Sequence, residues 1–415
     1  FGYCPQLARI SLPEGLKTID DYAFNSCKAL TKIVLPEGLR SLGKQVFQGC
    51  SSLKSVTLPA GLESIGEMTF NACSSLSYIA LPEGLLRIGE DAFTGCTGLR
   101  EVYFPETLRT IETKAFSFCH SLSAFTLPAS LDSIGTSAFY DCTALTEVTL
   151  PGSIRRMGSS IFTSCTSLET ALVEEGIEAL PYSIFDHCTA LRYVSLPQSL
   201  REIQYYAFSG CTALEEIELP EGLDSIFSGT FSRCTALKEI RVPENVKKIA
   251  SRAFQSCTAL AKISLPEGLT AIGEYAFANC TALKELDLPE NVERIGLNAF
   301  AGCTGLEEIS IPRSVRSYEI PWGTDPECRE LFTGATALKR IYVSWEEESL
   351  AATMRFDCPT EATVLLVPRG TLEVYRAGWG GTELPRFARI EEYDPDPTGL
   401  GSPVAGSDAA DPDAR

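Results

Sequence analysis

Apolar residues return along this chain in a pattern that repeats every 23 residues. In the copy that starts at Cys27, Leu30 comes first, the alternating pair Ile33-x-Leu35 follows, and Pro36 comes next. Alternation with a period of two, with β-branched residues at the inward positions, predicts a short β-strand. A proline directly after the strand fixes a turn and ends the hydrogen-bonded ladder.

The second half of the repeat brings the chain back to the same starting point. Leu39 and Leu42 return apolar side chains to the core, and Gly38 between them and the strand suits a turn residue with positive φ. The segment that precedes Phe47 is expected to form either a short second strand or a tight helical turn. It leads into Cys50, where the next copy begins.

A fixed period of this length is the mark of a solenoid, in which each copy is one supersecondary unit. Fourteen of the 16 cysteines keep the spacing of 23, from Cys4 to Cys303. A single unit leaves two faces uncovered, so it is stable only when it is stacked on its neighbours. We therefore expect successive strands to form a parallel sheet with a spacing of about 4.8 Å along one elongated core.

The pattern LxxIxLPxxLxxIxxxAFxxC, seen clearly in residues 237–257 and 260–280, resembles the BspA-like, 23-residue, Treponema-type leucine-rich repeat of surface proteins. The resemblance implies a leucine-rich repeat solenoid, a curved rod with a parallel β-sheet on one face and short strands and turns on the other. It also implies a role at the cell surface, in adhesion or host interaction. The period by itself predicts only the solenoid.

The period breaks near the C-terminus, and the break sets the expected domains. Residues 1–343 form an array of about 15 repeats. In the last repeat Ala335 takes the cysteine position 32 residues after Cys303, so it contains a 9-residue insertion within residues 318–328. The insertion, which includes Trp322, is either a capping feature or a binding loop. Residues 344–393 read as strand, turn, short helix and last strand, a C-terminal cap.

Both ends of the chain carry further expectations. Residues 394–415 are acidic and poor in apolar side chains, which predicts a disordered linker or tail. Phe1 already stands at the phenylalanine position of a repeat, so we expect more repeats or a cap upstream in the native protein. No apolar run is long enough for a transmembrane segment, and no signal or anchor stands in this chain.

The net charge and the cysteine spacing exclude several classes of function. The net charge of −19 argues against nucleic acid and anionic membranes as partners, because both require a basic face. The cysteine ladder is expected to be a reduced, buried part of the core, since cysteine packs as a small apolar group. Cys328 and Cys358 lie off the ladder and are the one plausible disulfide. No metal motif, phosphate loop or nucleophile elbow occurs, so we expect no cofactor and no enzymatic activity.

The outward positions of the predicted strands are the candidate ligand-binding surface. Some of them carry aromatic or apolar side chains where solvent is expected, and later copies carry acids. The candidates are Tyr78, Tyr103, Leu172, Tyr193, Glu216, Glu218 and Glu239. A plain solvated β-surface, on which tyrosine fits by propensity, explains the same residues.

These observations predict a binding or adhesion module of a secreted or cell-surface protein, which we expect to be monomeric. It would hold a protein or glycan ligand on the sheet face. The alternative is a structural spacer that projects another domain outward, which the monotony of the array and the linker-like tail favour.

Overall fold

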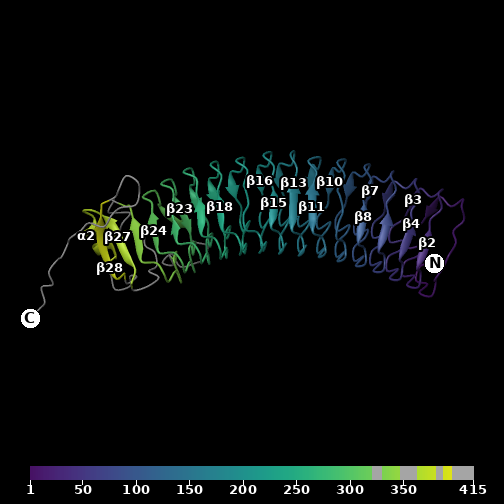
Figure 1. The fold of residues 1–415 in the computed structure, drawn as a ribbon, viewed down its shortest axis with the longest axis horizontal. Coiled ribbons are helices and arrows are strands. Elements are labelled where there is room, and N and C mark those ends of the chain that lie inside the picture. The colour runs from purple at the N-terminus through teal and green to yellow at the C-terminus, as the bar shows by residue number, and fades with distance from the viewer. Residues whose placement is uncertain (320–329, 346–361, 380–386, 395–415) are drawn as a thin grey trace, which may run out of the picture. The chain divides into compact units, whose positions relative to one another are not determined.

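The computed structural model describes residues 1–319, 330–345, 362–379 and 387–394. They form two compact units, Phe1–Leu237 and Lys238–Arg415, and each is considered by itself. The predicted leucine-rich repeat solenoid is confirmed in both units. Each is built from turns of parallel β-structure, and the described residues contain one short α-helix. Figure 1 shows the strands standing side by side along each unit.

Unit 1 has a first column of strands at the predicted positions. These strands are three or four residues long, and in the three-residue members the central side chain points into the core. They are β2 (Lys32–Val34), β4 (Ser55–Thr57), β6 (Tyr78–Ala80), β8 (Glu101–Tyr103), β11 (Glu147–Leu150), β13 (Thr170–Val173) and β15 (Tyr193–Ser195). Lys32 lies opposite Ser55, which is one repeat along, so the ladder register equals the sequence period.

A second column of two-residue strands resolves the open choice for the segment before each phenylalanine. A strand forms first, and a run of turns then leads to the cysteine. The strands are β1 (Thr18–Ile19), β3 (Ser41–Leu42), β5 (Ser64–Ile65), β7 (Arg87–Ile88), β9 (Thr110–Ile111), β10 (Ser133–Ile134), β12 (Arg156–Met157), β14 (Ala179–Leu180), β16 (Glu202–Ile203) and β17 (Ser225–Ile226).

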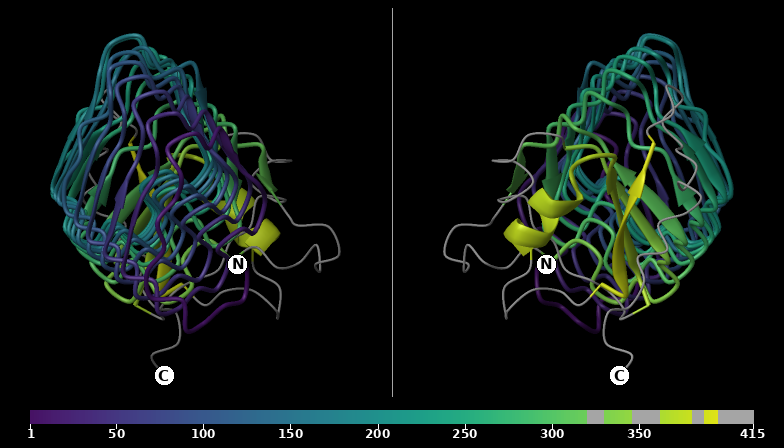
Figure 2. Two further views of the ribbon diagram at one scale, coloured as in Figure 1. Left: turned by 90° about the vertical axis from the view of Figure 1, so that its right-hand side faces the viewer. Right: turned by 90° about the vertical axis from the view of Figure 1, so that its left-hand side faces the viewer.

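The core of unit 1 is a set of columns of identical side chains. The phenylalanine rings from Phe1 to Phe231 stack along the unit with centroid separations of 5.0 to 5.8 Å. The cysteines from Cys27 onward are buried, whereas Cys4 is exposed in the first turn. In the end-on views of Figure 2, successive turns of unit 1 (purple to teal) overlie one another.

The turns before each cysteine contain two left-handed residues per repeat, at positions where the residue type varies. In the second repeat these are Tyr22 (φ 62°) and Ser26 (φ 57°). The expectation for Gly38 was wrong, because its φ lies outside the left-handed region. Gly38 serves close approach instead: a β-carbon there would lie 3.1 Å from the Glu14 carbonyl oxygen in the preceding repeat.

The first column of unit 1 has no assigned strand at 9–11, 124–126 and 216–218, and the middle gap contains Phe125. Ala124 makes only an isolated bridge to Glu101. Most other repeats have valine or isoleucine at the position of Phe125, such as Val102 and Val148. The larger ring stacks on Phe139 at a centroid separation of 4.5 Å.

Unit 2 continues the same repeat in both columns. The first column consists of β18 (Glu239–Arg241), β20 (Lys262–Ser264), β22 (Glu285–Leu286), β24 (Glu308–Ile311) and β26 (Arg340–Val343). The second consists of β19 (Lys248–Ile249), β21 (Ala271–Ile272), β23 (Arg294–Gly296) and β25 (Ser317–Glu319). Glu308 pairs with Arg340, an offset of 32 residues, and Ala335 is buried in the cysteine position. The ladder between β24 and β26 therefore has a register of 32 residues, where the other repeats have 23.

The end of unit 2 contains β27 (Val364–Pro368), α2 (Leu372–Trp379) and β28 (Arg389–Tyr393), and α2 lies against both strands. The indole nitrogen of the buried Trp345 donates to the Val315 carbonyl at 3.1 Å. The boundaries of array, cap and tail stay predictions, as does the disorder of residues 394–415. Trp322, Cys328 and Cys358 lie outside the described residues.

Candidate functional site

The outward positions of the first strand column in unit 1 form the surface called here the sheet face. Tyr78 on β6 and Tyr103 on β8 are 48% and 65% exposed. Their rings meet edge to face at a centroid separation of 6.4 Å. The Tyr103 hydroxyl donates to a carboxylate oxygen of Glu101 at 3.2 Å, which raises the pKa of Tyr103. The two rings therefore form one aromatic patch with a hydrogen-bonded edge.

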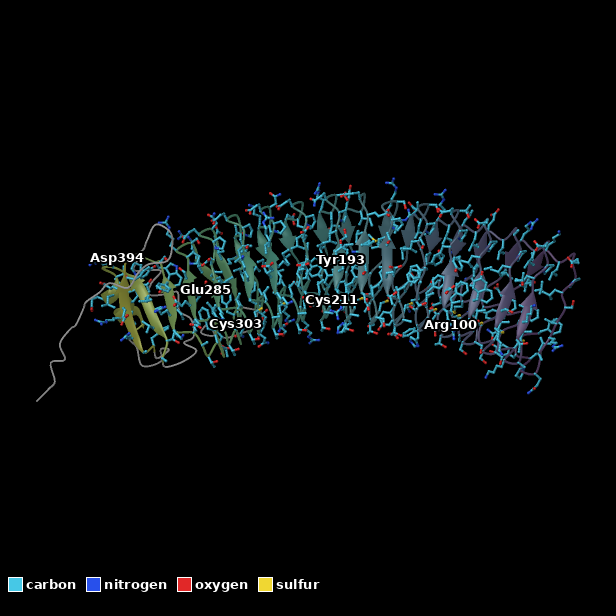
Figure 3. The ribbon with its side chains drawn as sticks, in the orientation of Figure 1. Arg100, Tyr193, Cys211, Glu285, Cys303 and Asp394 are labelled. Carbon is cyan, nitrogen blue, oxygen red and sulfur yellow. The ribbon has the colours of Figure 1, made fainter. Side chains whose placement is uncertain are left out.

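A second patch on the sheet face lies on β13 and β15. Leu172 is 36% exposed and Tyr193 is 58% exposed. Figure 3 labels Tyr193 on β15. Thr170 on β13 pairs with Tyr193 on β15, so Leu172, two residues after Thr170, is the diagonal neighbour of Tyr193. Tyr103 and Leu172 stand three repeats apart, which the strand spacing converts to about 14 Å. Both patches belong to unit 1 and lie on the same column of strands.

The acidic candidates are also exposed, but they do not form one described group. Glu216 and Glu218 lie in unit 1, in a segment that is not assigned as a strand, and Glu239 begins β18 in unit 2. Farther along unit 2, Glu308 is paired with Arg340 and Glu307 with Lys339. Lys339 and Arg340 therefore partly neutralise the acids in this part of unit 2, and Lys339 lowers the pKa of Glu307.

From Cys27 onward the cysteines of the ladder are buried, which does not suit a nucleophile or a metal ligand. The buried thiols from Cys27 to Cys234, and those of Cys280 and Cys303, each donate to the carbonyl of the phenylalanine 26 residues earlier, for example Cys73 to Phe47 at 3.1 Å. Burial raises the pKa of Cys50 and of Cys96 to about 12, so these thiols stay protonated at neutral pH. All fourteen ladder cysteines are free. Their prediction as reduced core holds for Cys27 to Cys303.

The two histidines each face an aspartate and lie on the surface. His120 Nε2 is 2.9 Å from Asp141 Oδ2, and His187 Nδ1 is 2.8 Å from Asp186 Oδ1. Both rings are about half exposed. Among the residues that the structure describes, no group of three or more His, Cys, Asp and Glu could hold a metal ion.

A second set of exposed aromatic residues lies in turns outside the strand columns, where the sequence pattern did not predict it. Tyr182 and Tyr205 are each 44% exposed in the turns that follow the second strand column. The same position holds Lys44, Glu67 and Glu90 in earlier copies. The sequence did contain a signal for these residues, because tyrosine stands there at a repeat position that is charged in earlier copies.

Comparison with known proteins identifies relatives by repeat and by fold. The family model described as BspA type Leucine rich repeat region (6 copies) matches residues 1–123, 109–238 and 201–320. A search of curated proteins finds no match. Within the described ranges, no helix is long and apolar enough to cross a membrane.

Solved structures agree with this fold. The chain is similar to a leucine-rich repeat protein from Bacteroides ovatus, with 26% identity and a TM-score of 0.64, covering 85% of this chain and 88% of that one. It is also similar to a leucine rich cell surface protein from Faecalibacterium prausnitzii, with 27% identity, a TM-score of 0.48, and 81% and 86% coverage. The pneumococcal vaccine antigen PcpA shares the fold at 21% identity and a TM-score of 0.52, with 90% and 91% coverage. With the family model matching most of its length, the chain belongs to the BspA-type leucine-rich repeat family.

Proposed function

We propose that this chain is a non-enzymatic binding and adhesion module of a secreted or cell-surface protein, and that it holds a protein or glycan ligand on the sheet face of unit 1. The exposed rings of Tyr78, Tyr103 and Tyr193 carry the proposal. Tyrosine is enriched where proteins contact partners, because it combines a large apolar ring with a polar hydroxyl. Membership of a family of repeat scaffolds supports an interaction role over a catalytic one.

The two patches on the sheet face support a ligand longer than one repeat. Tyr78 with Tyr103, and Leu172 with Tyr193, expose apolar surface about 14 Å apart on one column of strands. A ligand that touches both patches would gain from two contacts on a pre-formed surface, with little loss of conformational entropy in the protein. We propose that the module acts as a monomer, since one unit supplies both patches.

The test is a triple variant in which Tyr78, Tyr103 and Tyr193 are each replaced by serine. We expect adhesion to matrix proteins, host cells or a glycan array to fall by tenfold or more, because each ring supplies on the order of 1 kcal/mol at a contact. Tyr22→Ser is the matched control: Tyr22 is 46% exposed but lies in a turn outside the sheet face.

Two results would contradict the proposal. Adhesion that is equal in the triple variant and the parent would remove the sheet face as the binding surface. A parent chain that binds no protein, cell or glycan would favour the structural spacer. Circular dichroism of the triple variant should match the parent, since the three substituted rings are about half exposed or more.

A further inference from the structure

Unit 1 carries a second aromatic surface, separate from the sheet face, in the turns that follow the second strand column. It consists of Tyr182, Tyr205, Tyr206 and Phe227, called here the turn cluster. Tyr182 meets Tyr206 edge to face at 5.9 Å between centroids, and Tyr205 meets Phe227 at 5.1 Å. Three successive repeats supply these rings, so they form a contiguous patch on the unit.

The repeat itself does not require these rings. The position of Phe227 is glycine in several other copies, including Gly43, Gly66 and Gly135. Those copies form the same strand and turn without an aromatic side chain. Tyr206 lies flat on the next repeat, because a β-carbon at Gly229 would be only 2.3 Å from its ring. The cluster is therefore a local departure from the repeat, and its rings are held in place.

Unit 2 provides an example of what such a ring accepts. Tyr275 stands three repeats after Tyr206, at the same position of the repeat. The guanidinium carbon of Arg252 lies 5.6 Å from the centroid of the Tyr275 ring, a cation–π geometry. In the turn cluster, the position equivalent to Arg252 is Ser183, which is uncharged.

Charge near the cluster favours the same ligand. Each of its three repeats carries an acid three or four residues before the aromatic residue, namely Glu178, Glu202 and Asp224, against one cation, Arg201 beside Glu202. The chain as a whole has a net charge of −19. Guanidinium groups stack on aromatic faces and pair with carboxylates, a combination that an ammonium group matches less well.

We propose that the turn cluster is a second recognition surface that takes arginine side chains from a basic segment of a partner protein. The rings provide stacking faces, as Tyr275 does for Arg252, and the acids provide charge complementarity. The proposal does not depend on the sheet face, since the two surfaces share no residue.

The proposal is tested by fluorescence anisotropy with the full chain and a labelled nine-residue peptide that contains three arginines. Matched peptides carry lysine or the neutral isostere citrulline in place of arginine. We expect the arginine peptide to bind most tightly and the citrulline peptide most weakly. Tyr205→Leu and Phe227→Leu should each weaken binding about two- to fivefold, because leucine keeps the apolar contact and removes the π face.

Tyr193→Leu, on the sheet face, is the control and should leave the affinity for the arginine peptide unchanged. Three outcomes would overturn the proposal. They are no binding of the arginine peptide, equal binding by the parent and both ring variants, or a Tyr205-dependent affinity for an oligosaccharide without affinity for the peptide. Tyr182→Leu repeats the test at a ring that is 44% exposed, should a variant at Phe227 fail to fold.

Discussion

Inside the array, the carbonyl oxygen of a phenylalanine in the stacked column accepts two hydrogen bonds from two different repeats. Phe47 accepts the Cys50 amide at 3.1 Å within its own turn and the Cys73 thiol at 3.1 Å from the next. Cysteine thus combines a small, apolar side chain that fits the buried column with a weak donor. Ala335, at the turn where the period breaks, is small enough for the same position but has no side-chain donor. The spacing of cysteines in the sequence predicted their burial, but not this bond.

The thiol ladder makes a prediction about reactivity. Native protein treated with iodoacetamide at pH 8 should be labelled at Cys4 and spared at Cys96. Cys4 is exposed, whereas burial raises the pKa of Cys96 to about 12, leaving roughly a thousandfold less thiolate than an ordinary thiol. Peptide-level mass spectrometry reads the two sites separately. Labelling of Cys96 at the rate of Cys4 in folded protein would show that the core opens; urea-denatured protein is the control.

Between residue and fold stand the strands and turns, and here sequence reasoning succeeded unevenly. Period-two alternation predicted the first strand column, because one face of each strand is buried and the pattern follows. The left-handed turn residues were missed, because Phe118 and His187 occupy a position that glycine fills as Gly49 and Gly95. Stacking, rather than residue type, imposes that conformation. The turn cluster was missed for a related reason: its residues lie in turns, where no periodic pattern indicates exposure.

The left-handed position before each cysteine permits a paired test. Ala72 (φ 58°) and Gly95 (φ 73°) occupy it in successive repeats. Gly95→Ala should lower the free energy of unfolding by about 1 kcal/mol, and Ala72→Gly should raise it by up to a similar amount. A β-carbon at Gly95 meets no atom closer than 3.7 Å, so strain in the backbone is the whole effect.

Urea unfolding followed by circular dichroism measures both changes. Ser77→Gly is the control, because Ser77 lies outside the left-handed region and glycine there should destabilise through chain entropy. If Ala72→Gly and Ser77→Gly destabilised the protein equally, the left-handed conformation would not be the cause of the preference for glycine.

At the scale of the whole molecule, the two units share one repeat but differ in their buried thiols. Burial raises the pKa of nine cysteines in unit 1, from Cys27 to Cys234, and of Cys280 and Cys303 in unit 2. A raised thiol pKa means that the folded state keeps a proton that the unfolded chain releases. Stability from this source is complete below pH 9 and falls as the pH rises toward 12.

We therefore predict steep alkaline unfolding, steeper in unit 1 than in unit 2. Each such thiol removes about 1.4 kcal/mol per pH unit above pH 9, and the losses add over the ladder. Urea midpoints at pH 7 to 10.5, with limited proteolysis to separate the units, measure the slope. Replacing Cys73, Cys96 and Cys119 by alanine, the residue that fills the same position at Ala335, should flatten the slope of unit 1. An unchanged slope would assign alkaline unfolding to other groups.

The two-way hydrogen bonding of the phenylalanine carbonyl also bears on how such a chain changes over evolution. The thiol of each turn donates to a phenylalanine carbonyl of the previous turn, and the phenylalanine carbonyl of the same turn accepts the thiol of the next. The acceptor is therefore the same in every turn, so Cys119 could donate to the Phe70 carbonyl as well as it does to the Phe93 carbonyl. A recombination event that adds or removes 23 codons joins two matching surfaces and creates no new interface. The length of the array is then a heritable variable that can shift in single steps without disturbing the fold.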